Sequence, residues 1–210
     1  MKTINEYLNG NTYPGRGVLI GKSADNTSYV TAYFIMGRSE NSRNRIFEPT
    51  EDGIRTRAFD EKKLTDPSLI IYSPVRKVNG CTVVTNGDQT DTICQHGDFR
   101  KGLMTREYEP DEPNWTPRIS AILNADGSFE MSILKHKNGR CLREFFCYEG
   151  CDENQGYFIS TYQGDGNPLP TFAGEPLEVT VPKPEEVWAA LNGDNKVSLY
   201  TNCLLYTSPS

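Results

Sequence analysis

Three arginines lie close together in the segment 37-GRSENSRNR-45, directly after a run of apolar residues. Arginine makes planar, bidentate hydrogen bonds to phosphate, and serine and asparagine side chains add further donors. The whole chain carries a formal net charge of −6, so this cationic cluster is local. It predicts a site for a phosphate or a sugar, and the alternative is a solvated loop of mixed charge. The candidate binding residues are Arg38, Ser39, Ser42, Arg43, Asn44 and Arg45.

Four further segments place polar residues beside apolar, strand-like runs. The segment 13-YPGRG-17 predicts either a plain turn or a tight loop that approaches an anion. The segment 84-VTNGDQTDTI-93 predicts a loop that reads a base or an amide, or else the capped start of a helix. The segment 108-YEPDEPNWTPRI-119 is suited to hold one carboxylate in place, whereas a surface position is preferred for Asp111 and Glu112. Tyr72, in the segment 69-LIIYSPVR-76, is a candidate catalytic residue, and the alternative is that it only packs in the core. These segments add Arg16, Tyr72, Asn86, Gly87, Asp88, Thr90, Glu109 and Arg118 as candidates.

Composition narrows the possible classes of protein. The chain has 36% apolar and 24% charged residues, which is typical of a globular protein, and its 210 residues predict a single domain over 1–210. The acidic balance argues against a general nucleic-acid-binding surface. No apolar run is long enough to span a bilayer, and the start lacks the apolar core of a secretory signal, so a cytoplasmic location is expected. Cys141, Cys147 and Cys151 have the spacing C-x5-C-x3-C, which is wider than the C-x2-C spacing usual in zinc sites. Reduced thiols are therefore predicted, and a zinc site is the minor alternative.

The dominant local signal is paired strands joined by turn residues. Asn79-Gly80 and Asp126-Gly127 are typical hairpin turns. Strands are predicted over 16–22, 28–36, 69–78, 81–85, 118–124, 128–134, 143–148, 156–162, 176–181 and 197–201, and helices within 89–107 and over 184–192. This pattern predicts an α+β domain with antiparallel sheets. From Cys203 the alternation fails, so the chain is predicted to be truncated or to carry a non-native tail near 203–210, and roughly the last six residues are predicted to add little to the core.

In this order, the motifs YPGRGVLIGK, YFIMGRSENSRNR, YSPVR, VTNGDQTDTI and YEPDEPNWTPRI resemble the archaeal-type IMP cyclohydrolase family, which also has bacterial members. The resemblance covers most of residues 13–135 and weakens after about residue 140. It implies a four-layer αββα sandwich of antiparallel sheets. Such a fold is like that of the N-terminal-nucleophile hydrolases, but without self-processing, which agrees with a start at Met1.

The implied reaction is the last step of purine synthesis. The formamido group of a formylated aminoimidazole carboxamide ribonucleotide (FAICAR) condenses with the neighbouring carboxamide, and inosine monophosphate (IMP) and water result. The reaction demands no cofactor and no metal. The implied partner is therefore a small nucleotide, with no nucleic acid and no membrane, and with a homo-oligomer as an open option.

The resemblance also implies roles for residues. Glu109 is the candidate base, and Tyr72 the candidate acid or oxyanion donor. Arg38 or Arg118 would keep the carboxylate ionised and orient the substrate, and Arg38, Arg43 and Arg45 would clamp the phosphate. We expect one pocket to hold Arg38, Asn44, Asn86, Asp88 and Arg118 with Tyr72 and Glu109.

Two other functions compete with this interpretation. A non-catalytic purine-nucleotide-binding module would keep the arginines and lose the acid–base pair. An amidohydrolase of the N-terminal-nucleophile type would need a Cys, Ser or Thr exposed by processing. Retention of Tyr72 and Glu109 within matching motifs favours the cyclohydrolase.

Overall fold

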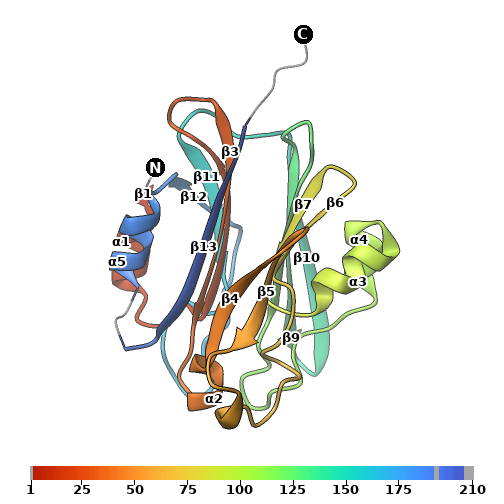
Figure 1. The fold of residues 1–210 in the computed structure, drawn as a ribbon, viewed down its shortest axis with the longest axis vertical. Coiled ribbons are helices and arrows are strands. Elements are labelled where there is room, and N and C mark those ends of the chain that lie inside the picture. Colours follow the sequence, from red (N-terminus) through yellow and green to blue (C-terminus); the bar gives the residue numbers. More distant parts are fainter. Residues whose placement is uncertain (1, 192–193, 206–210) are drawn as a thin grey trace.

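The computed structural model describes residues 2–191 and 194–205 (Figure 1). Its elements are short strands with few helices, as the hairpin signals predict. In chain order they are β1 (Lys2–Thr3), α1 (Ile4–Gly10), β2 (Arg16–Lys22), β3 (Ser28–Met36), α2 (Glu40–Arg43), β4 (Arg45–Thr50), β5 (Gly53–Ala58), the 3₁₀ turn η1 (Glu61–Lys63), β6 (Val75–Val78), β7 (Cys81–Thr85), α3 (Gln89–His96), α4 (Phe99–Met104), β8 (Arg118–Leu123), β9 (Phe129–Lys137), β10 (Arg140–Tyr148), β11 (Gln155–Ser160), β12 (Leu177–Thr180), α5 (Pro184–Ala190) and β13 (Lys196–Leu205).

The strands form two sheets. One has the order β1-β12-β11-β2-β3-β13 and the other the order β10-β9-β8-β7-β6-β5-β4. Every pairing is antiparallel except that of β1 with β12, so the protein is α+β. The β6–β7 hairpin turns at Asn79 and Gly80, which both have positive φ, as a tight two-residue turn requires.

The sheets pack face to face, and helices cover their outer faces (Figure 1). Side chains alternate along β3, so Tyr33 and Ile35 point into the central core while Phe34 and Met36 point outward. The outward set packs with α1 and α5, and a third cluster joins α3 and α4 to the other sheet. Each sheet is therefore buried on both sides, which explains why β2 and β3 are apolar without a polar face.

The structure confirms most predicted strands and both helical regions, the first of which holds two helices, α3 and α4. The predicted strand over 69–78 begins only at Val75, because Pro74 precedes it and residues 67–71 form turns. The last strand reaches Leu205, where the lost alternation predicted an earlier end, since its backbone keeps pairing with β3 as far as Ser28. Residues 206–210 lie outside the described residues. No helix in the described part of the chain is long and apolar enough to cross a membrane.

Candidate active site

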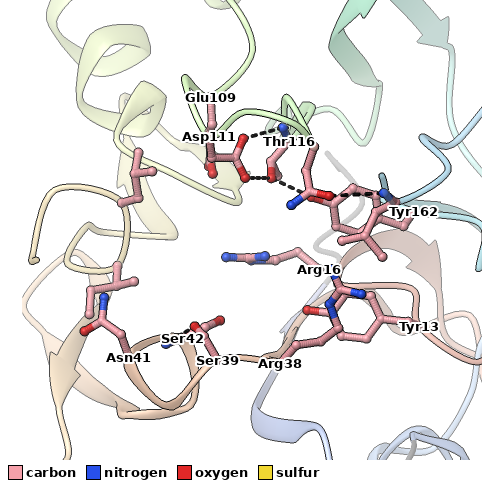
Figure 2. Close-up of a pocket in the computed structure, with 14 residues that line it drawn as sticks. Tyr13, Arg16, Arg38, Ser39, Asn41, Ser42, Glu109, Asp111, Thr116 and Tyr162 are labelled. Carbon is pink, nitrogen blue, oxygen red and sulfur yellow. Dashed lines mark hydrogen bonds between the residues drawn. The ribbon is translucent and has the colours of Figure 1, made fainter. Parts of the chain in front are cut away.

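A cavity of about 280 Å³ opens at the end of the sandwich where β2 starts and β3 and β11 end (Figure 2). Its walls come from separate parts of the chain, namely residues 13–16, 38–42, 69–70, 109–116, 162 and 169. Among the predicted site residues, those that line the cavity are Arg16, Arg38, Ser39, Ser42 and Glu109. A rigid sandwich thus positions short loops around one space, which is where binding groups commonly gather.

Glu109 is a carboxyl of this cavity whose titration lies close to neutral pH. Its side chain is only 3% exposed, and burial raises the pKa of its carboxyl to about 7. The charges of Arg16, Arg118 and Arg45 act in the opposite direction and limit the rise. Near neutral pH, Glu109 can therefore both accept and return a proton, which is the property of a general acid–base group.

Arg16 opens β2 and directs its guanidinium into the centre of the cavity (Figure 2). The guanidinium forms no hydrogen bond or ion pair with any described residue, and its buried Nε is left without a partner. Burial opposes its charge, but Glu109 and the neighbouring tyrosines outweigh burial and raise the pKa of Arg16. A buried cation without a protein partner is costly, so this group is well suited to meet a ligand.

Tyr72 lies beside this region but does not line the cavity. Its hydroxyl shares a 2.7 Å hydrogen bond with the hydroxyl of Tyr33, and both phenols act electrostatically on Arg16. The same group includes Arg45, which is 1% exposed and whose Nη1 has no partner among the described residues. Burial lowers the pKa of Arg45. Tyr33, Tyr72 and Arg45 therefore form a group of buried polar side chains that acts electrostatically on Arg16.

The cluster 38–45 divides into two groups of residues. Arg38 lies at the cavity, over the ring of Tyr13, and pairs with Asp165 at 2.8 Å. Arg43 is exposed in α2 and lies away from the cavity lining, because its helix turns it to solvent. Asn44 bonds the backbone N–H and C=O of Asp60 and so fixes the next loop.

Two serines of this cluster organise its backbone. Ser39 caps α2 by accepting a bond from the N–H of Ser42, and Ser42 in turn accepts two bonds from Arg45. Both serines still line the cavity. The predicted clamp of three arginines therefore reduces to Arg38 at the cavity, since Arg45 is buried behind it and Arg43 faces outward.

The segment 84–93 uses its polar groups within the protein. Asn86 donates to Pro117 O and accepts from the N–H of Ile119 and the amide of Gln89. Thr90 bonds Thr85 and the carbonyl of Gly87 at the start of α3. The structure thus gives Asn86 and Thr90 the alternative role, that of a helix start and its support.

Gly87, Asp88 and Arg118 form a connected group behind Glu109. Arg118 bonds Asp88 at 2.7 Å and Gln89 at 2.7 Å, and its charge lowers the pKa of Glu109. A Cβ on Gly87 would lie 2.6 Å from Nη1 of Arg118, so glycine leaves the space that this side chain occupies. The cavity therefore brings together only Arg38 and Glu109 of the seven residues expected in one pocket. The other five lie behind it or support it.

Asp111, Thr116 and Tyr162 line the cavity although they were not among the sequence-based candidate site residues. Asp111 accepts bonds from both the N–H and the hydroxyl of Thr116, and that hydroxyl also bonds the hydroxyl of Tyr162 (Figure 2). Asp111 therefore lies in the cavity wall, although a surface position was preferred for it, because the loop folds back onto β11. Tyr162 follows β11 beyond the resembling region, and no local signal marked it.

Gly15 explains part of the YPGRG motif. Its φ is +73°, and a Cβ there would lie 2.6 Å from the ring of Tyr162. Glycine is required both for the backbone conformation and for the close approach of this ring. The motif thus brings Tyr162 and Arg16 to the same wall.

The cysteines do not form a metal site in the part of the chain that the structure describes. All six are free thiols, and no group of three or more His, Cys, Asp or Glu side chains gathers among the described residues.

This geometry is that of a small-molecule enzyme with acid–base chemistry, in which a buried carboxyl of near-neutral pKa faces an unpaired arginine in a cavity. Comparison with known proteins then shows the family. The model of the IMP cyclohydrolase-like protein family matches residues 13–204, and the chain belongs to this family.

Three archaeal relatives named IMP cyclohydrolase are similar over most of their length. That of Methanopyrus kandleri is 31% identical over 162 residues, which cover 71% of this chain and 75% of the relative. That of Methanocaldococcus jannaschii is 28% identical over 178 residues, covering 79% and 82%. That of Methanocella arvoryzae is 27% identical over 159 residues, covering 72% and 74%.

Proposed function

We propose that this protein is an IMP cyclohydrolase, which closes the pyrimidine ring of FAICAR to give IMP and water. Membership of the family and the names of the three relatives support the reaction. The structural observation that carries the proposal is Glu109, a buried carboxyl with a pKa of about 7 in a cavity that also holds the unpaired Arg16.

The reaction consists of one addition and one elimination. The carboxamide nitrogen attacks the formyl carbon, so a C–N bond forms, and the nitrogen gives up one proton. The formyl oxygen takes up that proton. Its C–O bond then breaks while the formamide nitrogen loses its proton and a C=N bond forms, and the oxygen leaves as water. Both reacting groups belong to one molecule, so holding them in the correct orientation supplies much of the rate.

We assign the proton transfers to Glu109. As a carboxylate it removes the proton from the carboxamide nitrogen, and as a carboxylic acid it returns a proton to the departing oxygen. A pKa of about 7 suits both directions at neutral pH. A positioned acid–base group of this kind contributes roughly 10²–10⁴-fold in rate.

Two arginines have separate tasks in this proposal. The guanidinium of Arg16 faces the reacting centre and stabilises the negative charge that develops on the formyl oxygen. Arg38, with Ser39 and Ser42 beside it at the cavity, binds the phosphate. The two ends of a nucleotide thereby meet the two cations that line the cavity.

Tyr72 is the proposed second proton donor. One of the two protons of the Tyr33–Tyr72 pair forms the hydrogen bond between them, and the other stays available for donation. Tyr72 is 6% exposed and Tyr33 is fully buried, so Tyr72 is the more accessible member of the pair. Tyr72→Phe should lower kcat by more than Tyr33→Phe does, and equal losses would assign the pair to packing.

The direct experiment is ring closure by the purified protein. FAICAR is mixed with the protein, and the formation of IMP is followed by ultraviolet absorbance and chromatography. Turnover that is lost in Glu109→Gln but retained in a surface variant such as Lys77→Ala supports the proposal. Binding of IMP with no turnover would instead identify a non-catalytic nucleotide-binding module.

We also propose that the fold is that of the N-terminal-nucleophile hydrolases, used without a processed nucleophile, and that the enzyme acts in the cytoplasm on a free nucleotide. The order of helices, sheet, sheet and helices supports the first point (Figure 1). The soluble substrate of purine synthesis supports the second.

A further inference from the structure

The wall of the cavity opposite Asn41 carries a directed chain of hydrogen bonds. Asp111 accepts from the N–H of Thr116 at 2.6 Å and from the hydroxyl of Thr116, and the Thr116 hydroxyl bonds the hydroxyl of Tyr162. All three residues line the cavity, and Thr116 and Tyr162 are 2% and 1% exposed. The mechanism above uses none of them.

The donors in this chain can be assigned by counting protons. A threonine hydroxyl has one proton, and here that proton goes to the carboxylate of Asp111. Thr116 is therefore an acceptor toward Tyr162, and the phenol must donate. Burial raises the pKa of Tyr162, so the phenol keeps its single proton at neutral pH. The Tyr162 oxygen is then left with acceptor lone pairs alone, and no other described residue bonds it.

The ring of Tyr162 is held in place. It stacks on Tyr13 with centroids 5.9 Å apart, and Gly15 allows its close approach to the backbone. Its backbone N–H donates to Pro14 O and its carbonyl accepts from Asn11. A fixed, proton-poor oxygen in a cavity wall selects a ligand group that donates.

The order of residues along the wall indicates which ligand group meets this oxygen. Arg38 lies over the ring of Tyr13, Tyr13 stacks on Tyr162, and Tyr162 connects through Thr116 to the loop that carries Glu109. Tyr162 thus stands between the cation proposed for the phosphate and the carboxyl proposed for the reacting groups. In a nucleotide, the ribose occupies the position between phosphate and base.

We propose that Tyr162, oriented by Thr116 and Asp111, accepts a hydrogen bond from a ribose hydroxyl and makes the site selective for ribonucleotides over deoxyribonucleotides. Tyr162 is the specificity-determining residue, and Thr116 and Asp111 are positioning residues. This inference rests on the proposed function, because it takes the ligand to be FAICAR or IMP.

The test measures the dissociation constants of IMP, 2′-deoxy-IMP and 3′-deoxy-IMP by calorimetry. The wild type should bind IMP about threefold to tenfold more tightly than the analogue that lacks the contacting hydroxyl, as expected for one neutral hydrogen bond. Tyr162→Phe should weaken IMP by that factor, leave that analogue unchanged, and so abolish the discrimination. Tyr13→Phe removes a phenol from the same stack, and should leave the ratio of IMP to analogue as in the wild type.

Thr116→Val provides a second variant if Tyr162→Phe does not fold. It keeps the ring and removes the bond that orients the phenol, so the ratio should fall below that of the wild type. If wild type binds IMP but the ratio is the same in wild type, Tyr162→Phe and Thr116→Val, the inference is overturned while the proposed function stands. If the wild type binds neither IMP nor either analogue at millimolar concentration, both are overturned.

Discussion

The segment 84–93 and the cavity both bury polar side chains, but these side chains are used in opposite ways. In the segment, the amide of Asn86 has protein partners for both its oxygen and its nitrogen, and Thr90 is equally satisfied. At the cavity floor, the guanidinium of Arg16 and the carboxyl of Glu109 have no hydrogen bond with any described residue, although both are buried.

This difference distinguishes residues that support the fold from residues that can act on a ligand. A buried polar group with its hydrogen bonds formed inside the protein contributes to stability and has little left to offer a ligand. A buried charge without partners costs stability, and such groups persist where a ligand or a reaction uses them. Substitutions of Asn86 and Glu109 test this contrast.

The largest effect is expected for Glu109→Gln. Glutamine keeps the size and the polarity of the side chain but accepts no proton at neutral pH. We expect kcat to fall roughly 10²–10⁴-fold, with the affinity for IMP changed by less than about threefold. Single-turnover cyclisation of FAICAR and calorimetric titration with IMP measure the two quantities. A kcat within about twofold of the wild type would mean that another group moves the proton.

The titration of Glu109 should also make the free energy of unfolding depend on pH. Because its pKa is about 7 in the folded state and near 4.5 when unfolded, the folded state binds more protons between these values. Stability therefore falls as pH rises from about 4.5 to 7, by at most about 3 kcal/mol, and is level above that range.

Urea unfolding of wild type and Glu109→Gln at pH 5 and pH 8 measures this contribution. The variant should gain stability relative to the wild type at pH 8, where the wild type holds a buried carboxylate. The difference between the two proteins should shrink at pH 5. An equal difference at both pH values would show that Glu109 titrates as an ordinary carboxyl.

For Asn86, which supports the fold, the corresponding substitution is Asn86→Ala. Its side chain is fully buried, and its loss leaves the N–H of Ile119 and the carbonyl of Pro117 without partners. We expect a loss of roughly 2–3 kcal/mol in the free energy of unfolding. The affinity of the folded protein for IMP should change by less than about threefold. A stable variant with weakened IMP binding would restore Asn86 as a ligand-reading residue and break the comparison.

The sequence predicted the sheets better than the site. Turns such as Asn79-Gly80 and the apolar runs of β2 and β3 are local signals, so the hairpins could be located from them. Strands β4 and β5 were missed although Asp52-Gly53 is a hairpin signal between them, because Pro49 and several charged residues interrupt their few apolar positions. The early end predicted for β13 failed because backbone pairing with β3 does not need alternating side chains.

The site was harder, because a sequence shows which residues can hydrogen-bond but not whether their bonds are already formed. Arg16 and Glu109 were candidates for their residue type and motif, and both line the cavity. Asn44 was a candidate for the same reasons, but its amide already hydrogen-bonds the backbone of Asp60. Tyr162 reaches the wall only through the fold, since Gly15 and Thr116, which hold it, lie 147 and 46 residues away in the chain.

The smallest effect is expected for Arg43→Ala. Arg43 belongs to the arginine cluster, but α2 turns it to solvent and the cavity lining excludes it. Its charge near the end of a four-residue helix is worth a few tenths of a kcal/mol at a surface. We expect kcat/KM within about twofold of the wild type, and an unchanged affinity for IMP. Arg38→Ala is the matched control, since it removes an arginine of the same cluster that lines the cavity, and it should raise KM about tenfold or more. If both variants raised KM equally, the arginines would act together as one clamp, and position in the cavity would no longer separate binding residues from the rest.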